Sequence, residues 1–331
     1  MVGRPGNRMK RTIRIGSALL FTSALNLAVA QSYPVKPVRL IFPLLPGSAS
    51  NDILGRALAQ RLSESLGQQI VADYRPGAAG TIGAAIAAKS APDGYTLLIG
   101  YTSSIMISPT LLTSAGFNPV TDLAPIARFA VVPYIAVAHP SLPATNLRAL
   151  VALAKARPGQ INYASAGTGG LPHLAAELFK LTANVDIVHV PYKAAAAAHT
   201  DLLGGHVQMQ FTGISGQLPS IRAGRLRALA VTATKRSALL PEVPTAAEAG
   251  FPLLEVSSSL GVLAPANTPV PIVRRLHDEI ARIVNSTDLK DFIVRQGAEP
   301  ALMDPAEFGA HIKAESAKWA RVIKAANIKP E

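Results

Sequence analysis

The sequence predicts an α/β fold made of two similar units. Short apolar stretches of strand length alternate with single helix-length segments, first over residues 38–101 and again over residues 147–232. Strands separated by single helices form parallel sheets with helices on both faces, and such sheets bind ligands at the carboxyl ends of their strands. Glycines and hydroxyl residues follow several of the strands, so we expect the loops of each unit to lie together along one sheet edge.

The first unit contains three predicted strands, each followed by a loop of small or hydroxyl residues. The strands are Val38 to Phe42, Ile70 to Tyr74 and Leu97 to Tyr101, and the loops are Pro43 to Ser50, Arg75 to Gly80 and Thr102 to Ser104. A helix is predicted from Asp52 to Leu66, because apolar residues recur there at helical spacing. A second helix of small residues runs through Lys89.

The second unit repeats this alternation after an apolar stretch from Val131 to Ala138. Its predicted elements are a helix from Leu147 to Ala156, the strand and loop Ile161 to His173, a helix from Leu174, a strand from Ile187 to Val190, an alanine-rich helix through Leu203, a strand from Val207 to Phe211, the loop Thr212 to Gly216 and a strand from Ala228 to Thr232.

The C-terminal part is predicted to contain an apolar stretch from Glu255 to Ala264 and then three helices. Thr268 and the prolines that follow it are typical of a helix start. Asp304 and Glu307 have the spacing of a capping box for the last helix. The sequon beginning at Asn285 falls between two predicted helices. We therefore expect it to cap a helix and not to accept a glycan.

The N-terminus has the composition of a secretory signal peptide. Five basic residues precede a mostly apolar run from Ile15 to Ala28, and Ala28-Val29-Ala30 forms a small-x-small cleavage site. The apolar run is shorter than the roughly 20 residues of a spanning helix. We therefore expect residues 1–30 to be removed near Ala30, which leaves a periplasmic protein that is not embedded in the membrane.

Charge and composition exclude several classes of function. Removal of residues 1–30 lowers the formal charge from +12 by five, to +7. The remaining Lys and Arg form no run longer than two residues and do not interleave with aromatic residues, which argues against a nucleic-acid partner. The chain has no cysteine, so disulfides, thiol nucleophiles and thiolate metal sites are excluded. We expect no cofactor and no metal.

The stretch Ile161 to His173 (INYASAGTGGLPH) has the features of an anion-binding loop. Its glycines allow backbone N–H groups to point at one place, Ser165 and Thr168 add hydroxyls, and a helix N-terminus follows. The alternative is that the glycines only shape a strand-to-helix turn.

No catalytic motif of the hydrolase or metalloprotease type occurs. Asp52 and Asp201 are a conceivable acid–base pair, but Asp52 begins a helix, where capping explains it. His173 is more simply a capping or surface histidine than a metal ligand. Lys193 and Arg75 are possible partners of a ligand carboxylate, although solvated roles are commoner for both. We therefore predict that the protein is not an enzyme.

Eight short motifs occur in order along the chain, and together they resemble the Bug family, the periplasmic receptors of tripartite tricarboxylate transporters. The motifs are Pro43 to Gly47 (PLLPG), Arg75 to Ala78 (RPGA), Pro92 to Leu97 (PDGYTL), Leu153 to Gly159 (LAKARPG), Asn162 to Gly167 (NYASAG), His189 to Lys193 (HVPYK), Asp201 to Gly205 (DLLGG) and Leu226 to Thr232 (LRALAVT).

The resemblance implies a type II periplasmic-binding-protein fold, in which two α/β domains joined by two crossover strands close over a ligand. The crossovers would be Val131 to Ala138 and Glu255 to Ala264. Domain 1 would comprise residues 31–135 and 256–331, and domain 2 residues 136–255.

The resemblance also implies a set of ligand-binding residues. In the first domain these are Pro46, Gly47, Ser48, Gly77 and Thr102, and in the second domain Ser165, Gly167, Thr168 and Thr212. Ser48 stands where the family commonly has a glycine, and Ser259 and Leu260 replace a common Trp-Tyr pair. These departures mean that the ligand of a relative does not transfer directly.

The function implied by the resemblance is that of a monomeric receptor that captures a small organic acid for the membrane components of a tripartite tricarboxylate transporter. Two alternatives remain open at this point. The receptor could instead feed a membrane sensor or regulator, or the protein could be a hydrolase that uses Asp52 or His173.

Overall fold

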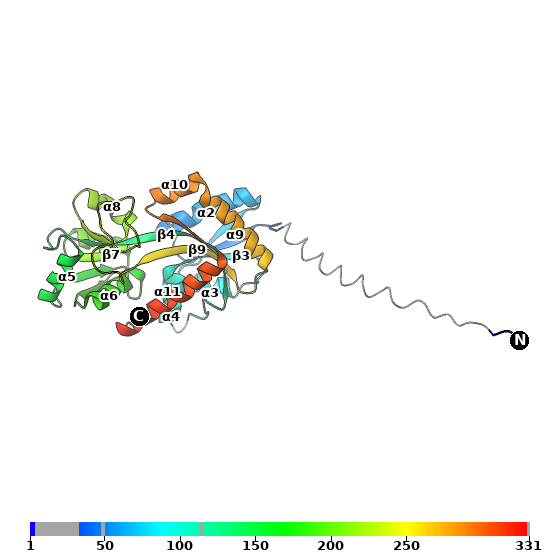
Figure 1. Ribbon diagram of the computed structural model, residues 1–331, viewed down its shortest axis with the longest axis horizontal. Helices are drawn as coiled ribbons and strands as arrows, with labels where there is room; N and C mark the ends of the chain where they lie inside the picture. The colour runs from blue at the N-terminus through cyan, green and yellow to red at the C-terminus, as the bar shows by residue number, and fades with distance from the viewer. Residues whose placement is uncertain (4–32, 48–49, 113–114, 330–331) are drawn as a thin grey trace.

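The computed structural model describes residues 1–3, 33–47, 50–112 and 115–329. The predicted signal peptide, apart from its first three residues, lies outside this range, and so does the predicted ligand residue Ser48. The described chain forms two lobes that are joined by long strands running from one to the other (Figure 1). The described strands belong to one sheet of ten strands.

The strands are β1 (Val38–Phe42), β2 (Ile70–Tyr74), β3 (Thr96–Tyr101), β4 (Leu123–Ala138), β5 (Asn162–Ser165), β6 (Val188–Pro191), β7 (Met209–Gly213), β8 (Arg227–Val231), β9 (Ser257–Pro265) and β10 (Glu299–Met303). The helices are α2 (Ser50–Leu66), α3 (Thr81–Ala88), α4 (Ser108–Leu111), α5 (Leu147–Ala156), α6 (Leu171–Ala183), α7 (Ala195–Leu203), α8 (Ile214–Arg222), α9 (Val270–Asn285), α10 (Thr287–Arg295) and α11 (Pro305–Ala325). Two short helical turns, η1 (Ala78–Gly80) and η2 (Ser103–Ile107), follow β2 and β3.

The first lobe is built on the parallel strands β2, β1 and β3, in that order across the sheet. Strand β3 then pairs antiparallel with β9. Strands β1 and β3 are apolar and mostly buried, whereas the edge strand β2 is largely exposed. Phe42 and Phe129 are fully buried in this lobe. Parallel strands place their carboxyl ends at one edge, so the three loops predicted for this unit lie on the same side of the lobe.

The second lobe has β5 at its centre, with β6 and β7 parallel on either side. Strands β7 and β8 pair antiparallel with the end of β4. Tyr163, Phe179 and Phe211 are fully buried there. The two predicted α/β units are therefore confirmed as two parts of one mixed sheet.

Strand β4 is the longest connection between the lobes. It pairs with β9 from Leu123 to Pro133 and with β7 from Tyr134 to Ala138, so it changes partner between residues 133 and 134. The predicted crossover began too late, at Val131, because Pro125 and a β-bulge interrupt the apolar pattern of the first half. The domain boundaries at residues 135/136 and 255/256 stay a prediction.

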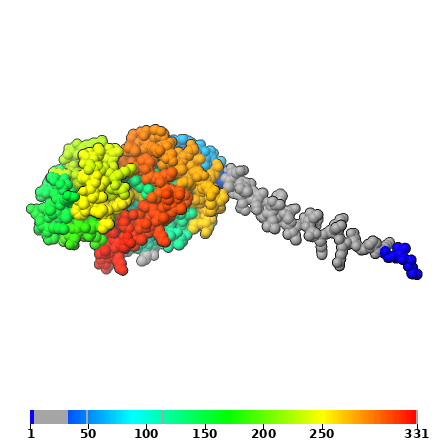
Figure 2. All heavy atoms as spheres, in the orientation of Figure 1, coloured from blue at the N-terminus to red at the C-terminus, as the bar shows by residue number. Residues whose placement is uncertain are grey.

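The three C-terminal helices return to the first lobe, where α9 and α11 pack against β4 (Figure 1). Asp304 and Glu307 form the predicted capping box of α11, and Ser286 caps α10. Gly261 of β9 permits close packing, because a Cβ at this position would lie 2.4 Å from the Phe308 ring. In the space-filling view, the yellow segment near residue 250 lies on the green second lobe, and the orange and red C-terminal helices lie next to it (Figure 2).

Three further elements differ from the sequence-based prediction. The predicted loop Thr212 to Gly216 is the end of β7 followed by helix α8, whose internal Pro219 hides it in the sequence. Strand β10 pairs with β4 although its sequence, EPALM, contains a proline and no β-branched residue and so does not indicate a strand. Helix α6 also begins three residues earlier than predicted, at Leu171.

Candidate functional site

The loop after β1 is held in place by the buried carboxylate of Asp52. Gly47, at φ +70°, donates its N–H to Asp52 Oδ2 at 2.8 Å, and Tyr74 donates its hydroxyl to Oδ1 at 2.7 Å. Arg56 adds a contact of 3.1 Å to Oδ2. Burial, and then the bond to this carboxylate, raise the pKa of Tyr74 to about 12. Asp52 is thus fully occupied with shaping the loop, and the predicted ligand residues Pro46 and Gly47 lie exposed on it.

The loop after β2 has an unusual backbone. Four consecutive residues, Gly77 to Gly80, have positive φ angles, and two of them are Ala78 and Ala79. An alanine in the left-handed region costs about 1–2 kcal/mol. Such strain is commonly kept at ligand-binding positions.

Gly80 is the point at which the three loops of the first lobe meet. A Cβ on Gly80 would lie 2.7 Å from Ser104 Cβ, 2.8 Å from the Tyr101 hydroxyl and 3.0 Å from the Pro43 carbonyl oxygen. These atoms belong to the ends of β1 and β3. The expectation that the three loops lie together is therefore confirmed.

Thr102 is placed differently from the exposed loop residues. It is 1% exposed, and its hydroxyl oxygen accepts a hydrogen bond of 2.9 Å from the Ser259 N–H of β9. Ser259 in turn bonds to His311 of α11 at 2.8 Å. Thr102 thus links the third loop to a strand that crosses between the lobes.

The loop Ser165 to Gly170 forms the corresponding feature of the second lobe. Ser165 is fully buried, and its hydroxyl bonds to the Gly167 carbonyl at 3.0 Å and to His189 Nε2 at 2.6 Å. Gly167 and Gly169 have φ angles of +117° and +76°. Thr168 lies half-buried between them. The side chain of Ser165 therefore shapes this loop.

A stacked pair of histidines lies beneath the same loop. The rings of His173 and His189 are 3.8 Å apart and nearly parallel, at 7°. His173 is buried, and its Nδ1 accepts a hydrogen bond of 3.0 Å from the Gly169 N–H. His173 thus bonds to the backbone before α6, whose N-cap residue, Gly170, has no side-chain cap hydrogen bond. Because His173 is buried, the predicted surface position is wrong.

Thr212 lies at the edge of the second lobe that faces the crossing strands. It is half-buried near the end of β7 and is paired with Ile135 of β4. Gly213, the next residue, is the N-cap of α8. Thr212 therefore stands between a crossing strand and a helix N-terminus.

The two lobes touch at the first turns of two helices. Ser50, the first residue of α2, and Ser215, the second residue of α8, have their hydroxyl oxygens 2.9 Å apart. On another part of the junction, Leu111 Cδ2 would lie 2.1 Å from a Cβ on Gly169, so the side chain of Leu111 packs directly on this glycine. The N-terminal turns of two helices, each with a partial positive charge, thus come together at the junction.

Few fixed charges accompany these loops. Arg75 is exposed and pairs at 3.0 Å with Asp73, a carboxylate that it shares with Arg39. Lys193 is exposed just before α7. The donors along the loops are backbone N–H groups, hydroxyls and helix N-termini, which together suit a small anion.

Comparison with known proteins settles the family. A sequence profile described as "Tripartite tricarboxylate transporter family receptor" matches residues 54–328. The chain belongs to this family. The receptor is 36% identical to Protein BugT of Bordetella pertussis over 318 residues, which cover 96% of this chain and 97% of BugT. The resemblance to the Bug family is thereby confirmed.

Two solved structures with bound acids are similar to the receptor. One is that of R. palustris Rpa4515 with adipate, which is 36% identical, has a TM-score of 0.79 and covers 90% of this chain and 100% of that chain. The other is MatC from Rhodopseudomonas palustris with bound malate, at 28% identity, a TM-score of 0.74 and coverage of 88% and 100%. The type II periplasmic-binding-protein fold is confirmed by these matches.

The family is one of solute receptors and not of enzymes. The residues of the hydrolase hypothesis agree with this, because Asp52 is fully buried among three partners and His173 supports a backbone N–H. Asp201, proposed as a partner of Asp52, bonds instead to Tyr192 at 2.7 Å.

No group of three or more potential metal ligands occurs among the residues that the structure describes. Likewise, none of the described helices is long and apolar enough to cross a membrane.

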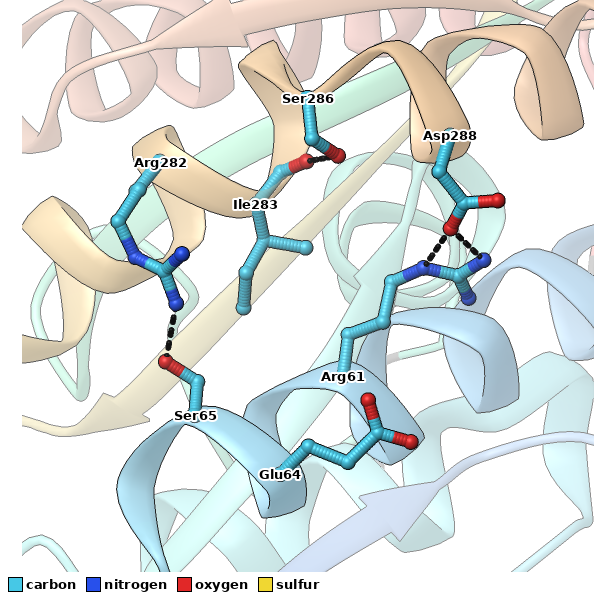
Figure 3. A pocket seen from close by; sticks show the side chains of 7 residues that line it. All are labelled: Arg61, Glu64, Ser65, Arg282, Ile283, Ser286 and Asp288. Atoms are coloured by element: carbon cyan, nitrogen blue, oxygen red, sulfur yellow. Dashed lines mark hydrogen bonds and ion pairs between the residues drawn. The ribbon is translucent and has the colours of Figure 1, made fainter.

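A surface hollow of about 330 Å³ on the first lobe is a competing candidate site (Figure 3). It lies between α2, α9 and α10, and its two arginines are already engaged. Arg61 pairs with Asp288 at 2.5 Å, and Arg282 contacts Ser65 and Glu279. Arg61 is eleven residues along α2 from Ser50, a distance of about 16 Å along the helix. The hollow therefore lies away from the loops and offers no uncompensated positive charge.

The sequence did not indicate the contacts that join the lobes or support the second loop. Ser50 and Ser215 both fall in predicted loops, and nothing in their sequence context shows that they contact each other. His189 is visible only as part of the HVPYK motif, and its stacking depends on the parallel register that places it beside Tyr163. One feature of the sequence could have indicated the support of the second loop: His173 follows a glycine-rich loop and stands at the start of a helix.

Proposed function

We propose that this receptor captures a small organic acid between its two lobes and delivers it to the membrane components of a tripartite tricarboxylate transporter. The observation that carries the proposal is the contact between Ser50 and Ser215, because it brings the N-termini of α2 and α8 from opposite lobes to one place. A carboxylate there would meet the positive ends of both helices at once.

The surrounding loops supply the rest of the proposed site. The ligand-facing set remains Pro46, Gly47, Ser48, Gly77, Thr102, Ser165, Gly167, Thr168 and Thr212. Within it we assign different roles, because the hydroxyls of Thr102 and Ser165 hold β9 and the second-lobe loop in place. Direct contact with the acid we assign to Thr168 and to the backbone N–H groups of the glycines.

The acids bound by relatives suggest the class of ligand. Adipate and malate are both dicarboxylates, and the proteins that hold them share 36% and 28% of their residues with this receptor. A dicarboxylate of four to six carbons is therefore the first class to test.

The proposed setting is the periplasm. The N-terminal sequence has the charge and apolar pattern of an exported protein cleaved near Ala30. The mature receptor would act as a monomer that opens and closes about β4 and β9, since these strands connect the lobes.

A thermal-shift screen of the purified receptor tests the proposal. Adipate and malate are compared with other mono- and dicarboxylates, and each acid is matched to its neutral amide, which has the same shape without the charge. We expect at least one acid to raise the melting temperature and its amide to have no effect, because only the charged group interacts with the helix N-termini.

Variants then connect the binding to the loops. Thr168→Ala should weaken binding of the stabilising acid without changing the melting temperature of the free protein. Thr200→Ala, on the exposed side of α7, is the matched control and should bind as the wild type does. The proposal fails if no acid in a broad set stabilises the receptor and native mass spectrometry of freshly purified protein detects no bound acid.

A further inference from the structure

The stacked rings of His173 and His189 support a loop of the second lobe in addition to packing in its core. They come from different elements, α6 and β6, and lie directly below the loop Ser165 to Gly170. The Tyr163 ring of β5 continues the stack, with its centroid 5.0 Å from that of His189. Three rings from three elements thus support one loop.

Each histidine makes a hydrogen bond to that loop through a different ring nitrogen. His173 uses Nδ1, which accepts the N–H of Gly169 at 3.0 Å. His189 uses Nε2, which bonds to the Ser165 hydroxyl at 2.6 Å. The same hydroxyl contacts the carbonyl and the N–H of Gly167 at 3.0 and 3.3 Å. Both glycines are therefore tied to the pair.

The surroundings disfavour a positive charge on the His189 ring. An Nδ1 atom that accepts a hydrogen bond carries no proton, so the proton of His173 is on Nε2, 3.9 Å from the Glu177 carboxylate. That carboxylate already accepts bonds from Tyr163 at 2.6 Å and Lys180 at 2.9 Å, so much of its charge is compensated. Two cations 3.8 Å apart would repel each other strongly. Burial first, and then His173 and Lys180, lower the pKa of His189 to about 3.

We infer that His173 and His189 are positioning residues for ligand capture, which hold Gly167 and Gly169 so that the loop presents its backbone N–H groups and Thr168 to the acid. This inference rests on the proposed function. It assigns the orientation of the second-lobe loop to two side chains that contact no ligand themselves.

The geometry allows a test with four variants of matched polarity. An asparagine places its amide near the position of the imidazole Nδ1, whereas a glutamine reaches the position of Nε2. Because His173 uses Nδ1 and His189 uses Nε2, His173→Asn and His189→Gln should preserve the loop. The opposite substitutions, His173→Gln and His189→Asn, should break these hydrogen bonds and leave the loop Ser165 to Gly170 unsupported.

The first measurement is hydrogen–deuterium exchange of the peptide that contains residues 165–170, in the ligand-free receptor at neutral pH. We expect wild-type protection in His173→Asn and His189→Gln, and exchange faster by about fivefold to tenfold in His173→Gln and His189→Asn, as for the loss of one hydrogen bond. His206→Asn, at an exposed position, is the control and should leave this peptide unchanged.

The second measurement is the affinity for adipate, or for malate if adipate does not bind, by calorimetry. His173→Gln and His189→Asn should bind several-fold more weakly, and His173→Asn and His189→Gln should bind as the wild type does. Equal hydrogen exchange of the 165–170 peptide in all four variants would overturn the inference. Faster exchange in His173→Asn and His189→Gln would overturn it as well. The exchange measurement needs no ligand. If the four variants show the expected exchange pattern but the receptor binds no acid, the role of the histidines is supported and only the proposed function is wrong.

Discussion

The hydroxyl oxygens of Ser50 and Ser215 lie 2.9 Å apart, although 165 residues separate them and they belong to different lobes. Each stands in the first turn of a helix, so their contact brings the N-terminal turns of α2 and α8 together. Ligand capture by the closing of two lobes requires such a place.

Ser215→Ala removes this contact between the lobes and little else. We expect affinity for the captured acid to fall by about fivefold, which corresponds to the net contribution of one hydrogen bond. The free energy of unfolding should change little, because each lobe retains its own core. Calorimetry beside Ser141→Ala, an exposed serine of the second lobe, measures the difference. Equal affinities in the two variants would show that the contact plays no part in binding.

Gly169→Ala tests the approach of the lobes at Leu111. A Cβ at this position would lie 2.1 Å from Leu111 Cδ2, so the lobes would have to separate locally. We expect weaker acid binding and partial recovery when Leu111→Ala is added.

The matched control for this substitution is Gly224→Ala. Gly224 has a similar φ of +68°, but a Cβ at this position would have no atom within 4 Å, so the substitution has the same backbone cost without the clash. If both alanine variants bind the acid equally well, the packing of Leu111 on Gly169 does not limit closure.

Asp52→Asn tests the support of the first loop. The substitution removes a charge that holds Gly47, Tyr74 and Arg56. We expect destabilisation of about 1–3 kcal/mol, typical of a broken buried hydrogen-bond network. Denaturant unfolding beside Glu64→Gln, an exposed carboxylate of the same helix, provides the comparison. A change below about 0.5 kcal/mol, the range of ordinary surface substitutions, would contradict this role.

The lowered pKa of His189 gives the receptor a defined pH dependence. The pKa of the group is about 3 in the folded state and 6.5 in the unfolded chain, so the unfolded chain binds more protons between these values. Stability should therefore decrease as the pH falls from about 6.5 towards 3. His189→Gln should flatten this part of the stability–pH curve. An unchanged slope in that variant would mean that other groups account for it.

The predicted fold was correct where local pattern and tertiary structure agree. Strand β1 and helix α2 were recognisable because their apolar residues have the periods of a strand and a helix. The ordered motifs supplied the two-lobe arrangement, which no local pattern contains. Strand β10 was missed since its residues become a strand only by pairing with β4, and α8 was missed because Pro219 interrupts it.

The sequence predicted which loops form the candidate site, but it did not predict the hydrogen bonds that their side chains make. The glycine-rich loops after β2 and β5 were visible in the sequence, and the structure places each at the carboxyl end of its strand, as predicted. That Ser165 faces His189 and Thr102 faces β9 depends on strand register and burial, which a single sequence does not contain. Two hydroxyls that the sequence offered to a ligand are for this reason bonded within the protein.

A crystal structure of the receptor with the acid that stabilises it most tests the proposed site most directly. We expect a carboxylate of that acid between the first turns of α2 and α8, within hydrogen-bond distance of their backbone N–H groups. A carboxylate bound instead in the hollow lined by Arg61 and Arg282, or elsewhere outside the junction of the lobes, would contradict it.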